Sequence, residues 1–156
     1  MNVRSLCVIA AMLFLAACQT SPQSGANAGG TAAASSVTPG SREDFVQNVG
    51  DRVFFDFDKS NIKPEGQQTL ERQAAWLKKY PNVKVTVEGH CDDRGTREYN
   101  LALGARRANA VKRALVALGI DANRITTISY GKERPAVIGD NEAAWAQNRR
   151  GVTVVQ

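Results

Sequence analysis

The sequence predicts an α/β fold in which one small, mixed, four-stranded sheet packs on two main helices. Segments with an apolar residue at every second position alternate along the chain with longer segments in which apolar residues recur every three or four positions. The predicted order is strand, helix, strand, helix, strand, short helix, strand, which is typical of an α/β sandwich. A length of 156 residues, with 43% hydrophobic and 22% charged residues, fits one domain of this kind.

The first seventeen residues are predicted to be an export signal and not part of this fold. One positive charge at Arg4 precedes an uncharged apolar run from Leu6 to Ala17, which is shorter than the roughly 20 residues of a bilayer-spanning helix. The run ends in Leu15-Ala16-Ala17-Cys18, which resembles the bacterial lipobox. The resemblance implies cleavage before Cys18 and addition of N-acyl and S-diacylglycerol chains to that cysteine, and Gln19 after it implies sorting to the outer membrane. An ordinary signal with a chance cysteine is the alternative.

Residues 19–41 are predicted to form a flexible linker. They contain no charged and no aromatic residue, so they cannot bury enough surface to offset the entropy of an ordered backbone. As a coil the linker would span about 25 Å, and about 75 Å when fully extended. The predicted organisation is therefore a signal at 1–17, a lipidated cysteine with linker at 18–41 and a folded domain at 42–156.

Cysteine use and net charge limit the classes of fold and ligand. Cys7 lies in the signal and Cys18 is the expected lipidation site, so Cys91 has no intramolecular partner and no disulfide framework is expected. A net charge of +5 suits anionic lipid, nucleic acid or an acidic cell-wall polymer. Export makes nucleic acid the least favoured of the three.

The folded domain is expected to begin near Arg42 with a strand and a helix. Residues 52–57 alternate, which places three apolar side chains on one face of a strand: Val53, Phe55 and Phe57. A helix should include Pro64 near its start and stop at Tyr80-Pro81. Its apolar positions at helical spacing are Leu70, Ala74 and Leu77.

The second half of the domain continues the alternation. Valines alternate with polar residues at 83–88, which predicts the second strand, and a long helix is expected at 99–119 with Gly119 closing it. The remaining elements are a third strand at 124–131, a short helix at 140–150 and a last strand at 151–155.

The long helix carries an arginine on its apolar stripe. Arg107 lies four residues from Leu103 and four from Val111, and the stripe continues through Leu115 and Leu118. A guanidinium in such a place is costly unless its donors are paired. We therefore expect an acidic side chain near this helix.

The acidic candidates follow the first two strands. If the strand at 83–88 runs parallel to the first strand, both end at one edge of the sheet, and Asp58 and Asp92 converge where the long helix begins. Two interpretations stay open: a structural ion pair between Asp92 and Arg107, or a cleft that binds a zwitterion through an acid and an arginine. The cleft would be lined by Asp58, Asp92, Arg94, Asn100 and Arg107.

Four motifs make the chain similar to the OmpA-like domain family. In the family's order they are FDFDKSNI, VEGHCDDRGTREYNLALGARRANAVKRAL, SYGKERP and NRRGV, and the similarity covers about residues 42–156. With the lipobox and short linker, the chain resembles the peptidoglycan-associated lipoproteins of that family. This resemblance implies non-covalent binding of peptidoglycan through meso-diaminopimelate of the stem peptide, from an outer-membrane anchor that faces the periplasm. It also implies TolB and the Tol complex as partners, and a role in outer-membrane constriction during division.

The resemblance also assigns site residues. On matching positions, Arg107 takes the side-chain carboxylate of diaminopimelate and Asp92 takes its ammonium group. The rest of the expected pocket is Phe57, Asp58, Arg94, Asn100 and Leu103. The chain departs from the family at Cys91, where a small alanine or threonine is usual. A thiol is of similar size, so binding is expected to survive, whereas oxidation of Cys91 is not expected to be tolerated.

Two alternative functions compete with this one. A peptidoglycan-degrading zinc enzyme would need several His, Cys or carboxylate ligands, but His90 is the only histidine and is expected to have a structural role. Asp92 and Asp93 are adjacent in an extended segment and should point apart, which disfavours a carboxylate-pair hydrolase. We expect no turnover, no metal and no cofactor. The second alternative is an OmpA-like wall-anchoring lipoprotein outside the Tol system.

Overall fold

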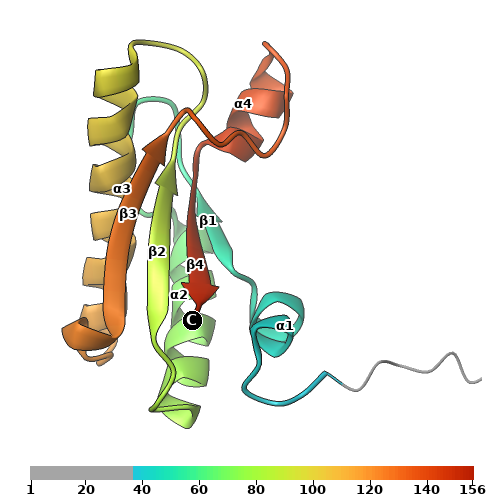
Figure 1. Ribbon diagram of the computed structural model, residues 1–156, viewed down its shortest axis with the longest axis vertical. Helices are drawn as coiled ribbons and strands as arrows, with labels where there is room; N and C mark the ends of the chain where they lie inside the picture. The colour runs from blue at the N-terminus through green and yellow to red at the C-terminus, as the bar shows by residue number, and fades with distance from the viewer. Residues whose placement is uncertain (1–36) are drawn as a thin grey trace, which may run out of the picture. The chain divides into compact units, whose positions relative to one another are not determined.

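The computed structural model describes residues 37–156, which form a mixed α/β domain with a four-stranded sheet, as predicted (Figure 1). The elements are α1 (Arg42–Asp44), a π-helical turn (Phe45–Val49), β1 (Arg52–Phe54), α2 (Pro64–Lys79), β2 (Val85–His90), α3 (Arg97–Ala117), a 3₁₀ turn (Ala122–Arg124), β3 (Ile125–Gly131), α4 (Glu142–Asn148) and β4 (Arg150–Val155). None of the helices within residues 37–156 has the length and hydropathy to cross a bilayer. The predicted signal, Cys18 and linker residues 19–36 lie outside the described residues.

The sheet order brings the ends of β1 and β2 to one edge. The strands lie in the order β1-β4-β2-β3, with β4 antiparallel to both its neighbours and β2 parallel to β3. Because β4 lies antiparallel between them, β1 and β2 run in the same direction. The parallel orientation on which the cleft prediction depended is therefore present.

Both main helices cover the same face of the sheet (Figure 1). α2 has Pro64 at its first turn and ends at Lys79, with Tyr80 as its C-cap and Pro81 next in the chain, as its sequence indicates. α3 begins after the capping hydroxyl of Thr96 and ends before Gly119, whose φ is +91°. The buried apolar side chains between the layers include Val53, Phe55, Leu70, Leu77, Val85, Val87, Val111, Leu115 and Ile125.

The first strand is shorter than the alternation indicated. β1 ends at Phe54, and although Phe55 is buried, Phe57 is 54% exposed and does not continue the apolar face. The backbone N–H of Phe55 still donates to Arg149 O, at 2.9 Å. Asp58 then adopts a φ of +57° and turns the chain. Phe57 is thereby directed to the pocket described below, and not to the core.

α3 approaches β2 more closely than side chains would allow. A methyl group at Gly89 would lie 1.8 Å from the carbonyl oxygen of Gly104, and one at Gly104 would lie 2.3 Å from Ser129 Oγ. These distances are far below van der Waals contact, so both positions require glycine. This contact sets the height of α3, and therefore of Arg107, above the sheet.

His90 is 1% exposed and lies on the opposite face of the sheet, with its ring beside that of Tyr130, at 5.5 Å between centroids. Burial, together with the positive charge of Arg150, lowers the pKa of His90 from 6.5 to about 4. The histidine is therefore neutral at pH 7 in the folded domain.

This depressed pKa predicts a loss of stability in mild acid. The unfolded chain takes up a proton on His90 near pH 6.5, whereas the folded domain resists protonation down to about pH 4. The free energy of unfolding should therefore decrease between pH 6.5 and 4, by at most roughly 3 kcal/mol, and should not depend on His90 above that range. Urea unfolding of the wild type and His90→Gln at several pH values measures this difference. If the two proteins have parallel pH profiles, the acid sensitivity belongs to other groups.

Candidate functional site

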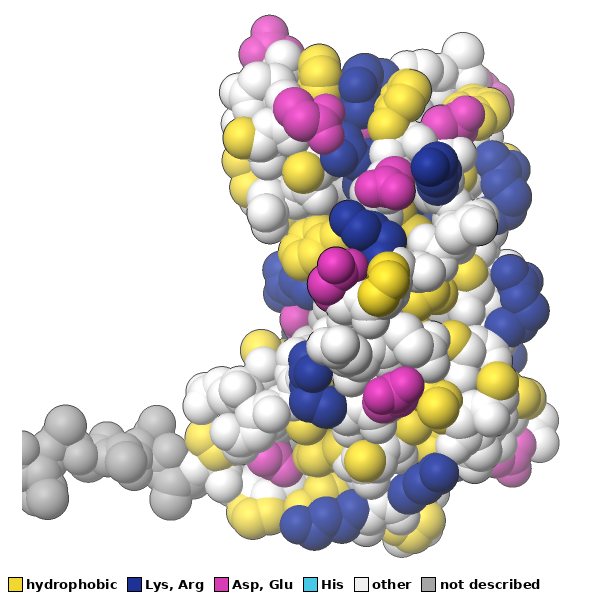
Figure 2. Space-filling model, turned by 180° about the vertical axis from the view of Figure 1, so that it is seen from behind, with side chains coloured by type: hydrophobic (Ala, Val, Ile, Leu, Met, Phe, Trp, Pro, Cys, Tyr) yellow, Lys and Arg dark blue, Asp and Glu magenta, His cyan; other side chains and the backbone are white. Residues whose placement is uncertain are grey.

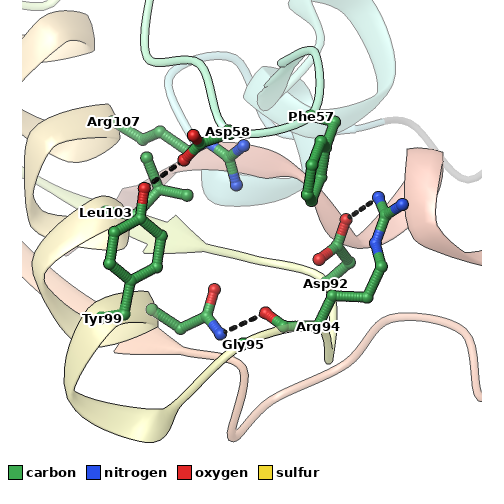
Figure 3. Close-up of a pocket in the computed structure, with 9 residues that line it drawn as sticks. Phe57, Asp58, Asp92, Arg94, Gly95, Tyr99, Leu103 and Arg107 are labelled. Atoms are coloured by element: carbon green, nitrogen blue, oxygen red, sulfur yellow. Dashed lines mark hydrogen bonds and ion pairs between the residues drawn. The ribbon is translucent and has the colours of Figure 1, made fainter.

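A pocket lies where the ends of β1 and β2 meet the first turns of α3 (Figure 3). It encloses about 460 Å³, including space open to solvent. All seven residues expected from the sequence line it, together with Gly95 and Tyr99, which were not anticipated. The lining is Phe57, Asp58, Asp92, Arg94, Gly95, Tyr99, Asn100, Leu103 and Arg107.

Arg107 is fully buried, at 0% exposure, and its guanidinium is held by three backbone carbonyls. Nε donates to Lys59 O at 2.9 Å, Nη1 to His90 O at 2.8 Å and Nη2 to Asp56 O at 3.0 Å. A guanidinium has five N–H donors, so these three bonds leave one N–H on each terminal nitrogen without an oxygen acceptor among the described residues. Burial lowers the pKa of Arg107, but an arginine remains charged at neutral pH.

The expected acid beside Arg107 is not what satisfies it. Within residues 37–156, no carboxylate forms an ion pair with this guanidinium, and Asp92 pairs instead with Arg94 and Arg149. Of the two interpretations left open by the sequence, the structural ion pair between Asp92 and Arg107 is therefore wrong. The physical reason is that backbone carbonyls lie within hydrogen-bond distance of the guanidinium. Those of Asp56 and Lys59 follow β1, and that of His90 ends β2. They accept three of its five N–H donors and leave its positive charge without an ion pair to a carboxylate.

Asp92 is 4% exposed, and one of its two carboxylate oxygens is already occupied. Oδ2 accepts from Arg94 Nη2 at 2.5 Å and lies 3.4 Å from Arg149 Nη1. Oδ1 accepts no hydrogen bond from the described residues and is turned toward the pocket (Figure 3). Asp93, its neighbour, is exposed, so the two carboxylates point apart as expected.

Arg94 is stacked between two aromatic rings. Its guanidinium carbon lies 3.9 Å from the centre of the Phe57 ring and 4.0 Å from that of Trp145 on α4. The hydrogen bond to Asp92 raises the pKa of Arg94. Trp145 was not anticipated, because nothing in the sequence relates the short helix to a loop that lies so much earlier in the chain. The stack holds the guanidinium that in turn orients Asp92.

The opposite wall of the pocket is formed by Asp58, Tyr99 and Asn100. The hydroxyl of Tyr99 donates to Asp58 Oδ1 (Figure 3). Aspartate is among the few residues other than glycine that tolerate the left-handed backbone found at position 58. The Asn100 amide donates to the carbonyls of Arg94, at 2.7 Å, and Thr96, at 3.0 Å, which fixes the loop that carries the other wall.

The pocket thus combines a buried cation, free acceptor oxygens and apolar surface. Arg107 can receive a carboxylate through its two unused N–H groups, and Asp92 Oδ1 can receive an ammonium group. Phe57 and Leu103 line the same pocket and supply its apolar surface. In the described part of the chain, no group of three or more histidine, cysteine or acidic side chains is placed to hold a metal ion. The arrangement suits a small zwitterion with an aliphatic body.

The sequence pattern of the OmpA family matches residues 54–149, which include every residue that lines the pocket. The chain belongs to the OmpA family. The four sequence motifs therefore identify the family correctly.

Relatives within the OmpA family are similar over most of the chain. The peptidoglycan-associated lipoprotein of Agrobacterium fabrum is 55% identical over 145 residues, covering 92% of this chain and 82% of the relative. That of Rhizobium meliloti is 59% identical over 122 residues, covering 78% of this chain and 69% of the relative. The crystal structure of the peptidoglycan-associated lipoprotein from Burkholderia pseudomallei superposes with a TM-score of 0.70 at 41% identity, covering 74% of this chain and 100% of that one.

Proposed function

We propose that this OmpA-family chain is an outer-membrane lipoprotein that binds peptidoglycan non-covalently and tethers the membrane to the wall. The observation that carries the proposal is the buried Arg107, whose charge has no counter-ion within residues 37–156 and whose unused donors face a pocket opposite Asp92. The names of its similar relatives, which are peptidoglycan-associated lipoproteins, support the choice of ligand.

The ligand group that best fits this pocket is meso-diaminopimelate in the stem peptide. Its side chain ends in a carbon that bears both a carboxylate and an ammonium group, on an aliphatic stem. The carboxylate would pair with Arg107 and the ammonium group with Asp92, while the stem contacts Leu103. Each charge-assisted hydrogen bond contributes roughly 1.5–3 kcal/mol, so one site binds weakly. Many anchored copies facing one polymer make the attachment multivalent.

Asp92 and its neighbour offer a matched test of this function. The mature chain from residue 18, carrying Cys18→Ala to keep it soluble, is sedimented with sacculi that contain diaminopimelate. Asp92→Asn should weaken binding roughly 10- to 100-fold, because the amide cannot neutralise the ammonium group. Asp93→Asn removes the same charge from the exposed neighbouring position and should bind like the wild type. Thermal melts establish that each variant is folded.

Two outcomes of that experiment would reject the proposed pocket. If folded Asp92→Asn sediments like the wild type, the ammonium group is not bound there. If both asparagine variants lose binding equally, the interaction depends on net charge and not on this site. Release of muropeptides during the incubation would instead indicate an enzyme.

The proposed anchor depends on Cys18, which lies outside the described residues. Three acyl chains attached there would hold the protein stably at the membrane, because one chain alone gives only reversible binding. The test is made in cells that produce the protein with Asp92→Asn, so that wall binding is already weakened. Adding Cys18→Ala to this protein should move it from the outer-membrane fraction to the soluble periplasmic fraction. Immunoblotting of the two fractions measures the shift. Retention of the double variant in the membrane would reject the lipid anchor.

We further propose that the protein acts with TolB and the Tol complex and supports outer-membrane constriction during division. This proposal extends the resemblance to the peptidoglycan-associated lipoproteins. A wall-anchoring lipoprotein outside the Tol system is the alternative. Co-purification of TolB with the Cys18→Ala protein distinguishes them, since only the first predicts a complex between the two purified proteins.

A further inference from the structure

A groove runs along β4 on the face of the sheet that the two main helices leave uncovered. In Figure 1, α2 lies behind β2 and β4 and α3 lies behind β3, and no helix of the described part crosses in front of these strands. The groove encloses about 900 Å³, including space open to solvent. One wall is Arg42, Phe45 and Val46 before β1, and the far end is closed by Arg134 and Arg150. It does not share a residue with the pocket around Arg107.

Positive charge in this groove exceeds negative charge. Four arginines line it, Arg42, Arg52, Arg134 and Arg150, against only Asp51 and Glu88. Asp51 forms an ion pair with Arg52, with Nε 2.8 Å from Oδ1, whereas the neutral His90 beside Glu88 adds no positive charge. Four arginines and two acidic residues leave an excess of two positive charges in the groove. Among residues 37–156, the other three arginines form no ion pair with a carboxylate. On the helix-covered face, by contrast, basic and acidic side chains are interspersed (Figure 2).

Arg150 gives the strongest indication that an anion binds in the groove. It is 8% exposed and yet forms no ion pair within residues 37–156. Its two hydrogen bonds, to the carbonyls of Asn148 and Arg134, are both long at 3.3 Å. Burial and the nearby charge of Arg52 lower the pKa of Arg150. A buried guanidinium that is poorly paired in this way is stabilised when an anion enters beside it.

The shape of the groove favours an extended chain over a flat surface. β4 has six residues, so the groove follows it for about 20 Å. Half-exposed Val46 and the β4 residues Val152 and Val154 also line the groove, which adds apolar surface to the cationic side chains. A planar bilayer cannot enter a concave groove of this length. The linker of this chain cannot supply the anions, because residues 19–41 contain no acidic residue.

We propose that this groove binds an extended, acidic peptide segment of a partner protein. Carboxylates of the segment pair with Arg134 and Arg150 at one end and with Arg42 at the other. Its apolar side chains lie on the valines that line the groove. The site is independent of wall binding, since it lies on residues that the pocket around Arg107 does not use.

The test uses the mature chain with Cys18→Ala and a fluorescein-labelled octapeptide in which glutamate alternates with valine. Binding is followed by fluorescence anisotropy at low ionic strength. The double variant Arg42→Glu/Arg134→Glu reverses two exposed charges of the groove and should weaken binding by about tenfold or more. Lys78→Glu/Arg113→Glu makes the same change in net charge on exposed positions of α2 and α3, and should alter binding by less than about twofold.

Three further measurements complete the test. A peptide with lysine in place of glutamate should not bind, and sedimentation with sacculi should be unchanged in both double variants. Vesicles of phosphatidylglycerol, added in place of the peptide, should not distinguish the groove variant from the control. The proposal is overturned if the acidic peptide does not bind, if both double variants weaken it equally, or if reversal of the groove charges abolishes vesicle binding alone.

Discussion

Arg107→Ala should abolish detectable co-sedimentation with sacculi and should also destabilise the domain. Binding is lost because the buried guanidinium is the proposed partner of the diaminopimelate carboxylate, and a bidentate charged contact is worth roughly 100-fold in affinity. Stability falls because the carbonyls of Asp56, Lys59 and His90 lose their donors. With unsatisfied buried groups costing about 1–3 kcal/mol each, we expect a loss of roughly 3 kcal/mol or more in the free energy of unfolding.

Arg107→Lys separates these two effects. Lysine keeps the charge and three donors but lacks the planar fork, so it should restore part of the stability while binding remains at least about tenfold weaker. Urea unfolding and sedimentation are measured on the same preparations. If Arg107→Lys regains both stability and full binding, a bidentate contact with the ligand is not made.

The proposed contact between Arg107 and the diaminopimelate carboxylate can also be removed from the side of the ligand. Sacculi that carry lysine in place of diaminopimelate lack the side-chain carboxylate but keep the ammonium group. The wild type should therefore bind them as weakly as Arg107→Lys binds diaminopimelate sacculi, and the two changes together should cost little more than either alone. Additive losses would show that Arg107 and the carboxylate act independently, which would reject the proposed pairing.

Gly89→Ala should strongly destabilise the fold, although it adds only one methyl group. The added carbon would lie 1.8 Å from the carbonyl oxygen of Gly104, and that oxygen belongs to the backbone of α3, which cannot move alone. Relief requires α3 to move away from β2, which opens the core along the whole helix. We expect a loss of at least roughly 3 kcal/mol, or about 15 °C in the thermal midpoint.

Gly66→Ala is the matched control for this substitution. A methyl group at Gly66 in α2 would meet Ile62 Cγ2 at 3.3 Å and Val53 Cβ at 3.4 Å, distances that small side-chain shifts relieve. Alanine also favours the helix by up to about 1 kcal/mol, so the net change should be small. Calorimetry of both variants measures the contrast. Equal midpoints for Gly89→Ala and the wild type would show that α3 is free to shift, and that its height does not set the position of Arg107.

Local pattern determined the elements, but not all of their boundaries: β2 begins at Val85 and not at Val83, and α3 begins at Arg97 and not at Tyr99. Alternating valines indicated β2, and the spacing of Leu70, Ala74 and Leu77 indicated α2, because burial on one face imposes these periods. Phe57 followed the same alternation but left the sheet, because Asp58 turns the backbone there. No periodicity reports such a turn.

In the pocket, too, the sequence determined which residues come together, and the tertiary structure determined which of them form hydrogen bonds. The sequence alone placed a charge on the buried stripe of α3 and acids after two strands that end at one edge, and this brought all seven expected residues to one pocket. It also determined the family, through motifs that are local strings of residues. Only the tertiary structure decided which groups pair: Arg107 meets carbonyls up to 51 positions away, Asp92 meets Arg149, and Trp145 stacks on Arg94. Hydrogen-bond partners depend on distances of a few tenths of an ångström between distant segments, and such distances exist only once the sheet and helices have packed.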